Sequence, residues 1–112
     1  MDPDETLLVL GTQYNSAILG ATDEPKSVKQ LSNDLDIPIA TCYRRVEELT
    51  EAGLLELDDR VLSDEHRRTS VYRRRVDEVT VQFTEAGYEV DVAERSQVKN
   101  KLDDVWRTVA ND

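Results

Sequence analysis

Cysteine and histidine are almost absent from this sequence, which contains one of each, Cys42 and His66. A single cysteine cannot form a disulfide within the chain, and one copy cannot assemble a zinc site from these two residues. The sequence also offers no glycine-rich phosphate-binding loop and no candidate catalytic triad. We therefore expect no metal, no cofactor and no enzymatic activity.

Long apolar runs are missing as well. No stretch approaches the roughly 18 residues that would span a bilayer. The first residues, MDPDET, lack the basic and apolar regions of a secretory signal. With 112 residues, the chain is long enough for one domain with a small core. These features predict a compact cytoplasmic protein.

Lysine is scarce, and acidic residues are in large excess. The chain contains 24 acidic and 14 basic residues, which give a net charge of -10. This excess disfavours a polyanionic partner, but the segment from Arg44 to Arg75 is neutral because it contains eight arginines and eight acids. An acidic composition with only four lysines is typical of proteins that work in molar potassium chloride, so we expect a halophilic source.

The N-terminal half has the pattern of three helices. Apolar residues recur at helical spacing in residues 5–20, which predicts a first helix. A second helix is expected to begin at Ser27, with Gln30 as its capping-box partner. The tripeptide DIP then breaks the chain before a third helix, which begins near Pro38 and is expected to end at Gly53.

The third predicted helix has an apolar side and a polar side. Cys42, Val46 and Leu49 are spaced so that they share the apolar side, while Thr41 and Arg44 point the opposite way. Cysteine is among the residues most often buried, so a packing role for Cys42 is favoured over redox sensing.

The C-terminal half predicts two β-hairpins. Residues 54–58 and 70–74 read as strands joined by the polar stretch 59–69. A change of side-chain parity between Tyr72 and Val79 indicates a bulge or a break. The second hairpin turns at TEAG, and we expect it to extend the same sheet. Its facing apolar residues are Val79, Val81 and Phe83 on one strand and Tyr88, Val90 and Val92 on the other.

A last apolar stripe marks a predicted C-terminal helix. Few apolar residues remain in the chain to cover this stripe, so a second subunit is its natural cover. We expect a homodimer in which the first helix contributes to the contact. The residues predicted at the dimer interface are Leu7, Leu10, Tyr14, Val98, Leu102, Val105, Trp106 and Val109.

Two short helices joined by three residues and followed by a hairpin have the element order of a winged helix-turn-helix. The stretches VKQLSNDLDIPIATCYRRVEELTEAGLLE and TSVYRRRVDEVTVQF resemble haloarchaeal winged-helix transcription regulators of the ArsR, MarR and PadR type. The likeness covers roughly residues 5–92, and ATCYRRVEELTEAGLL is its most specific piece. It implies an α+β fold: a winged helix-turn-helix DNA-binding domain with an extra β-hairpin in residues 1–92, and a C-terminal dimerisation helix in residues 93–112.

The resemblance implies a regulator that binds double-stranded operator DNA. Its third helix would lie in the major groove, where arginine can bond guanine, and its hairpin would lie on the backbone or in the minor groove. Pro38 and Ala40 stand where relatives often have serine, which leaves the docking angle open. The residues that map onto DNA contacts are Ser27, Lys29, Ala40, Thr41, Tyr43, Arg44, Arg45, His66, Arg67, Arg68 and Arg73. A response to oxidative stress is a further expectation that rests on the resemblance alone.

Several of these residues also have a structural interpretation. Arg44 and Arg45 can pair with glutamates three or four positions along the helix. The arginines at 73–75 can pair with acids of the neighbouring strand, and His66 can simply be solvated. For the whole chain, the alternative function is an acidic winged-helix module that binds protein and does not select DNA sequences.

The net charge does not by itself exclude DNA. In molar salt the Debye length is ~3 Å, so distant carboxylates hardly repel phosphates and local contacts decide. Where carboxylates lie close to phosphates, we expect potassium ions to bind between them. The predicted partners are therefore operator DNA, a second copy of the chain and potassium ions at the DNA interface.

Overall fold

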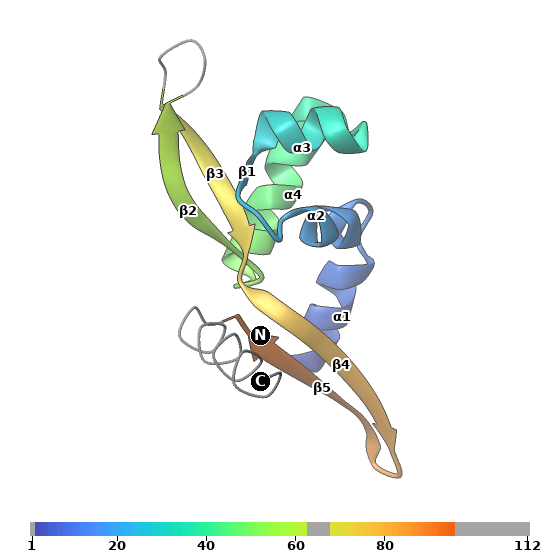
Figure 1. The fold of residues 1–112 in the computed structure, drawn as a ribbon. Coiled ribbons are helices and arrows are strands. Elements are labelled where there is room, and N and C mark those ends of the chain that lie inside the picture. Colours follow the sequence, from blue (N-terminus) through green and yellow to red (C-terminus); the bar gives the residue numbers. More distant parts are fainter. Residues whose placement is uncertain (1, 63–67, 96–112) are drawn as a thin grey trace, which may run out of the picture.

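The computed structural model describes residues 2–62 and 68–95, with the backbone alone for 59–62 and 68. This part of the chain is α+β, with four helices and two small antiparallel sheets (Figure 1). None of its helices has the length and apolar character needed to cross a membrane. In chain order the elements are α1 (Pro3–Gly11), α2 (Asn15–Ala21), β1 (Lys26–Ser27), α3 (Val28–Leu35), α4 (Ile39–Glu51), β2 (Leu55–Leu62), β3 (Arg68–Arg74), β4 (Val76–Thr84) and β5 (Gly87–Glu94).

The prediction of one helix over residues 5–20 is wrong, because the structure has two helices there. α1 ends at Gly11, and Tyr14 adopts a left-handed conformation with φ 75° before α2 begins. The buried side chain of Asn15 donates a hydrogen bond of 2.8 Å to the carbonyl of Val9, which stabilises the break. Apolar spacing continues across the break, so the pattern alone does not reveal it.

α3 begins where the capping box predicts. The hydroxyl of Ser27 accepts a hydrogen bond from the backbone N–H of Gln30 at 3.1 Å, and the Gln30 side chain accepts one from the Ser27 N–H at 2.9 Å. The predicted break at DIP is also confirmed. Asp36 is left-handed, Pro38 is the N-cap residue, and α4 begins at Ile39.

Gly53 ends α4, as its position in the sequence predicts. Its φ is 78°, its N–H donates to the carbonyl of Thr50 at 3.0 Å, and the N–H of Leu54 donates to that of Leu49 at 2.9 Å. This pair of bonds is a Schellman motif, in which the left-handed residue is usually glycine because a Cβ is strained there. The motif turns the chain directly from α4 into β2.

One core cluster holds the helices against the base of the first sheet. The predicted apolar side of α4 is confirmed, since Cys42, Val46 and Leu49 are all buried. Leu10, Tyr14 and other partly buried residues pack around this cluster. Its buried members are Ile18, Leu19, Val28, Leu31, Ile37, Cys42, Val46, Leu49, Leu54, Leu55 and Val76.

The first sheet is three-stranded, with β3 between β1 and β2. The hairpin of β2 and β3 is the wing that the sequence predicts, and its strands run further toward the tip than expected. A bulge shifts the register between Leu57 and Asp59. β1 was not predicted, because a strand of two residues has no pattern of its own.

β4 and β5 form a hairpin with the predicted register, in which Val81 lies opposite Val90 and Phe83 opposite Tyr88. The expectation that this hairpin extends the first sheet is wrong, because it forms a separate two-stranded sheet. The two sheets separate at Arg75, between β3 and β4, where the change of parity predicts a break.

Several predicted residues fall outside the described part of the chain. They include the stripe of the predicted C-terminal helix, although β5 itself continues as far as Glu94. The residues concerned are His66, Arg67, Val98, Leu102, Val105, Trp106 and Val109.

We predict that Gly53→Ala lowers the free energy of unfolding by about 1–2 kcal/mol, because alanine is strained in the left-handed region. The matched control is Gly20→Ala within α2. At either position a Cβ would have no other atom within 4 Å, so the backbone conformation alone distinguishes them. Gly20→Ala should be neutral or stabilise by up to ~1 kcal/mol. Urea unfolding followed by circular dichroism measures both changes, and equal losses would contradict the interpretation.

Candidate nucleic-acid interface

The solvent-facing side of α4 carries the first group of candidate residues. α3, α4 and the wing are neighbours in space, so this side lies between the other two elements that could touch DNA (Figure 1). Tyr43 is 59% exposed and Ile39 46% exposed, which is high for large apolar or aromatic side chains. Ala40 and Arg44 are exposed beside them, and Thr41 is partly exposed.

Arg44 and Arg45 are neighbours in sequence, but the structure separates them. Arg45 is partly buried, and its Nη1 lies 2.9 Å and 3.1 Å from the two carboxylate oxygens of Glu48. This is one of the helical ion pairs that the sequence allowed. Arg44 is exposed, and within the described part of the chain no acid pairs with it. The pair with Glu48 holds the Arg45 side chain along the helix, whereas no described acid holds Arg44.

The exposed side of α4 changes character along its length. Tyr43 and Arg44 lie in its first two turns, while Glu47, Glu48 and Glu51 follow in the last two. The amino end of a helix also carries a partial positive charge from its backbone dipoles. The N-terminal half of α4 is therefore the part suited to a polyanion, which agrees with recognition helices that contact bases through their N-terminal residues.

Ser27 and Lys29, the candidate phosphate contacts at the start of α3, differ in availability. Ser27 is 7% exposed, and its hydroxyl is already engaged in the capping box. Lys29 is exposed in the first turn of α3. Of these two residues, Lys29 is the one placed to reach a phosphate.

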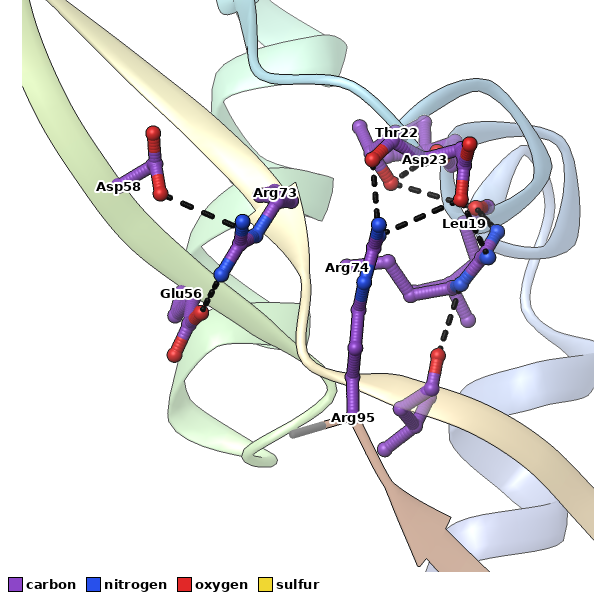
Figure 2. A network of polar contacts seen from close by, with 10 residues as sticks. Leu19, Thr22, Asp23, Glu56, Asp58, Arg73, Arg74 and Arg95 are labelled. Carbon is purple, nitrogen blue, oxygen red and sulfur yellow. Dashed lines mark hydrogen bonds and ion pairs between the residues drawn. The ribbon is translucent and has the colours of Figure 1, made fainter. Parts of the chain in front are cut away.

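Arg73 lies on the wing, and the described structure shows it in ion pairs. Its guanidinium lies 3.3 Å from the carboxylate of Glu56 and 3.8 Å from that of Asp58, both on the neighbouring strand β2 (Figure 2). Glu56 is directly opposite Arg73 in the β2–β3 register. This is the structural role that the sequence left open for Arg73. Arg68 lies in β3 nearer the tip, where the backbone alone is described.

Arg74 joins the wing to the helices. Its guanidinium donates to the carbonyl of Val76 at 2.7 Å and to that of Leu19 at 3.0 Å, and it pairs with Asp23 at 3.2 Å (Figure 2). Arg95 pairs with the same Asp23 carboxylate at 3.3 Å and donates to the Asp23 carbonyl at 2.8 Å. We call Asp23, Arg74 and Arg95 the Asp23 clamp. It ties the start of β4 and the end of β5 to the end of α2.

The sequence analysis did not predict the Asp23 clamp. It proposed acids of the neighbouring strand as partners for the arginine triplet. Asp23 is 51 residues from Arg74 and 72 from Arg95, and no local spacing relates them. The last residue of the triplet, Arg75, pairs with Glu94 at 3.7 Å. All three arginines of the triplet therefore contact acids in the structure. Fewer arginines are available for DNA than their number in this part of the sequence suggests.

Cys42 is on the opposite side of α4 from Arg44, within the core. It is fully buried, and its Sγ lies 3.6 Å from the carbonyl oxygen of Val28. Burial raises the pKa of the Cys42 thiol, because the apolar surroundings disfavour the thiolate. Thiolate is the reactive form. The position therefore suits packing between α3 and α4 better than reaction with oxidants.

We predict that the Cys42 thiol reacts with iodoacetamide many times more slowly in the native protein than in urea. The raised pKa keeps the thiol protonated in the folded state at pH values where the unfolded state ionises, above about 8.5. Its contribution to stability is thus present below that pH and is lost as the pH rises. The unfolding free energy of wild type should fall more steeply from pH 8 to 10 than that of Cys42→Ala, and equal slopes or rapid native alkylation would contradict this account.

Comparison with known families supports the same assignment. Residues 10–58 match the family model of a helix-turn-helix domain. The matched range runs from the end of α1 through α4 into β2, so it contains both helices of the pair and excludes β3 and the β4–β5 hairpin. No curated protein matches the chain. The family match supports a helix-turn-helix DNA-binding domain, a kind of domain whose partner is DNA and which is typically non-enzymatic.

Proposed function

We propose that the protein is a homodimeric transcription regulator that binds a specific DNA operator. In this proposal α4 enters the major groove, and the wing of β2 and β3 lies on the backbone or in the minor groove. The observation that carries the proposal is the exposed pair Tyr43 and Arg44 on the N-terminal half of α4, within a matched helix-turn-helix.

The dimensions and chemistry of α4 fit that role. Its 13 residues make a rod about 20 Å long, and a major groove about 12 Å wide admits a helix. Arg44 can donate two hydrogen bonds to guanine, and Tyr43 can reach a phosphate through its hydroxyl. Ala40 can contact a thymine methyl group. Lys29 on α3 and the arginines near the wing tip would hold the backbone on either side.

The acids in the second half of α4 shape the conditions under which it can bind. Glu47 and Glu51 are exposed a turn or more beyond Arg44 and would approach the phosphates that flank the groove. We propose that potassium ions bind between these carboxylates and the phosphates. Molar potassium chloride would supply the ions and screen the rest of the net charge of -10.

Dimerisation rests on the apolar stripe predicted in residues 93–112, with α1 as a second contributor. In α1, Leu7 is partly exposed and Leu8 is 72% exposed, whereas Leu10 and Tyr14 pack against their own core. A two-fold dimer would present two copies of α4 to half-sites about 10 bp apart, or a multiple of that spacing.

The finer assignment, to a haloarchaeal regulator of the reactive-oxygen response similar to RosR, rests on the sequence resemblance. Cys42 is the one thiol in the chain, and it is buried. Direct sensing of an oxidant by a thiol of this protein would require Cys42 to become exposed. We therefore propose that the protein regulates genes of the stress response and that Cys42 serves in packing, without sensing the oxidant.

A protein-interaction module is the second candidate function. The exposed acids Glu47 and Glu51 on α4 favour it, because they would repel DNA at low salt. This alternative requires a protein ligand for α4 and no preference among DNA sequences. Selection from random duplex DNA in molar potassium chloride separates the two functions, because a regulator enriches a near-palindrome.

We predict that Arg44→Ala lowers affinity for the selected operator by about 5- to 150-fold, the effect of losing a bidentate contact worth about 1–3 kcal/mol. The matched control is Arg75→Ala, which removes an exposed arginine at the β3–β4 junction, away from α4. Its affinity should stay within about two-fold of wild type, because it makes no base contact. Fluorescence anisotropy in molar potassium chloride measures both, and an unchanged Arg44→Ala would remove α4 from the proposed interface.

We also predict that affinity for the operator changes little, or rises, between about 0.2 and 2 M potassium chloride. Ordinary DNA binding loses about 0.9 log units of affinity per neutralised phosphate for each log unit of salt. Uptake of potassium ions at Glu47 and Glu51 would oppose that loss. Glu47→Gln should therefore steepen the fall of affinity with salt, whereas Glu85→Gln in the distant β4–β5 turn should not. A steep fall for the wild type would contradict bound potassium ions.

A further inference from the structure

One face of the β4–β5 hairpin carries a row of apolar side chains, which the proposed DNA contacts do not use. Strand pairing sets Val79 opposite Val92, Val81 opposite Val90 and Phe83 opposite Tyr88. Side chains alternate between the two faces of a strand, so these three pairs stand in a row on one side. We call this side the hairpin face, and its six residues are Val79, Val81, Phe83, Tyr88, Val90 and Val92.

The hairpin face is poorly covered by the described part of the protein. Phe83 is 86% exposed and Val92 is 42% exposed, while the other four residues are partly buried and none of the six belongs to the buried core. The hairpin contributes Val76 alone to that core, and its outer half extends away from the helices (Figure 1). An isolated two-stranded hairpin is at best marginally stable in water. The hairpin face therefore requires a cover.

The charges of the hairpin indicate which kind of molecule can cover the hairpin face. Residues 76–94 contain six acids and no lysine or arginine, which disfavours DNA as the cover of the hairpin face. The acids within the paired strands include Glu78, Glu89 and Asp91, whose register places them on the face opposite the apolar row. The six residues of the hairpin face are uncharged. The acid that alternation places on the same side, Glu94, lies at the inner end of β5, where it pairs with Arg75.

We propose that the hairpin face packs against the same face of a second copy of this chain. The inference rests on the proposed homodimer and specifies one of its contact surfaces. Consider a two-fold axis that lies in the interface and crosses the two strands at Val81 and Val90. It would place each of these valines over the same residue of the other copy. The aromatic pair Phe83 and Tyr88 would then lie over the partner's Val79 and the partner's Val92.

This arrangement makes the surface self-complementary. Large side chains at the outer end of one hairpin meet small ones at the inner end of the other, so the two rows interdigitate as packed sheets do about 10 Å apart. Glu78, Glu89 and Asp91 of each copy then point outward, away from the seam. Nothing in the pairing needs a change in either hairpin.

The size of the hairpin face indicates that it is one part of a larger interface. Strands of eight residues are about 27 Å long and stand about 5 Å apart. This area is well short of the ~800 Å² per partner that a stable dimer buries. α1 contacts β5 and carries Leu7, which the sequence predicts at the dimer interface. The predicted contacts on α1 and on the C-terminal stripe would supply the remaining area of the interface.

The attachment of the hairpin gives this interface a consequence for DNA. The Asp23 clamp holds the start of β4, through the bond of Arg74 to the Val76 carbonyl, and the end of β5, through Arg95, against α2 and the segment after it. A dimer joined through the hairpins therefore sets the separation and the angle of the two α4 helices. The hairpin seam would determine which half-site spacing the dimer accepts.

Cross-linking tests the proposed two-fold axis directly. Val81→Cys places a thiol next to the same thiol of the partner, while Gln82→Cys places one on the opposite, outward face. With a short bis-maleimide at micromolar protein concentration, Val81→Cys should become a covalent dimer and Gln82→Cys should remain largely monomeric on a denaturing gel. Wild type, whose Cys42 is buried, serves as the blank. Equal cross-linking of the two variants, or none of Val81→Cys, would overturn the arrangement.

A second measurement keeps the hairpin distinct from the C-terminal stripe. Phe83→Lys should weaken dimerisation at least ten-fold in sedimentation equilibrium, with an unchanged circular dichroism spectrum, whereas Gln82→Lys adds the same charge on the other face and should not. If Phe83→Lys remains dimeric while Trp106→Ala is monomeric, the hairpin seam is wrong and the proposed homodimer stands. If the wild type is a monomer and still selects a half-site through Arg44, both the hairpin seam and the homodimer are wrong. The proposed DNA binding would then stand.

Discussion

Burial of one side of α4 is the constraint on which the rest of the structure depends. Cys42, Val46 and Leu49 are each at most 2% exposed, and they lock the rotation of the helix about its own axis. With that rotation set, Tyr43 and Arg44 can point only outward, and Arg45 comes to lie beside Glu48. The Schellman motif at Gly53 then turns the chain directly into β2, so that α4 and the wing are adjacent.

The arginines whose side chains the structure describes differ in whether they have acidic partners. Those of the triplet contact acids of β2, of β5 or of the segment after α2, and Arg95 shares Asp23 with Arg74. Ion pairs on exposed surfaces contribute little each, but Arg74 and Arg95 also donate hydrogen bonds to backbone carbonyls of distant segments. Arg44 stands apart from them, so one arginine of α4 combines exposure, a suitable helix and the absence of a described acidic partner.

The acidic surface and the apolar hairpin face serve different partners. Under the proposed function, the acids would keep the molecule hydrated in concentrated salt, where screening removes most of their repulsion toward DNA. The same salt strengthens burial of apolar surface if its ions are excluded from the protein. A dimer seam made of valines and aromatic residues is therefore favoured under the conditions in which ion pairs across a seam would be weakened.

Features that depend on nearby residues were determined by the sequence alone. The capping box at Ser27, the two sides of α4, the glycine that ends it and the register of the β4–β5 hairpin all follow from spacings of a few residues, which local hydrogen bonds and side-chain alternation impose. The outward position of Arg44 was predicted in the same way, because helical periodicity places it opposite Cys42, whereas its candidacy as a DNA contact came from the family resemblance.

Other features were decided only by the tertiary structure, because they depend on residues brought together from distant parts of the chain or on a competition between contacts. The first helix is split because Asn15 fits the carbonyl of Val9, although the apolar pattern runs through the break. Asp23, Glu56 and Glu94 decide which arginines remain available, because each of them pairs with at least one. These partners lie far apart in sequence, so no periodic pattern reveals the pairs. The separation of the two sheets likewise follows from the anchoring of the β3–β4 junction to α2, which holds the second hairpin away from the first.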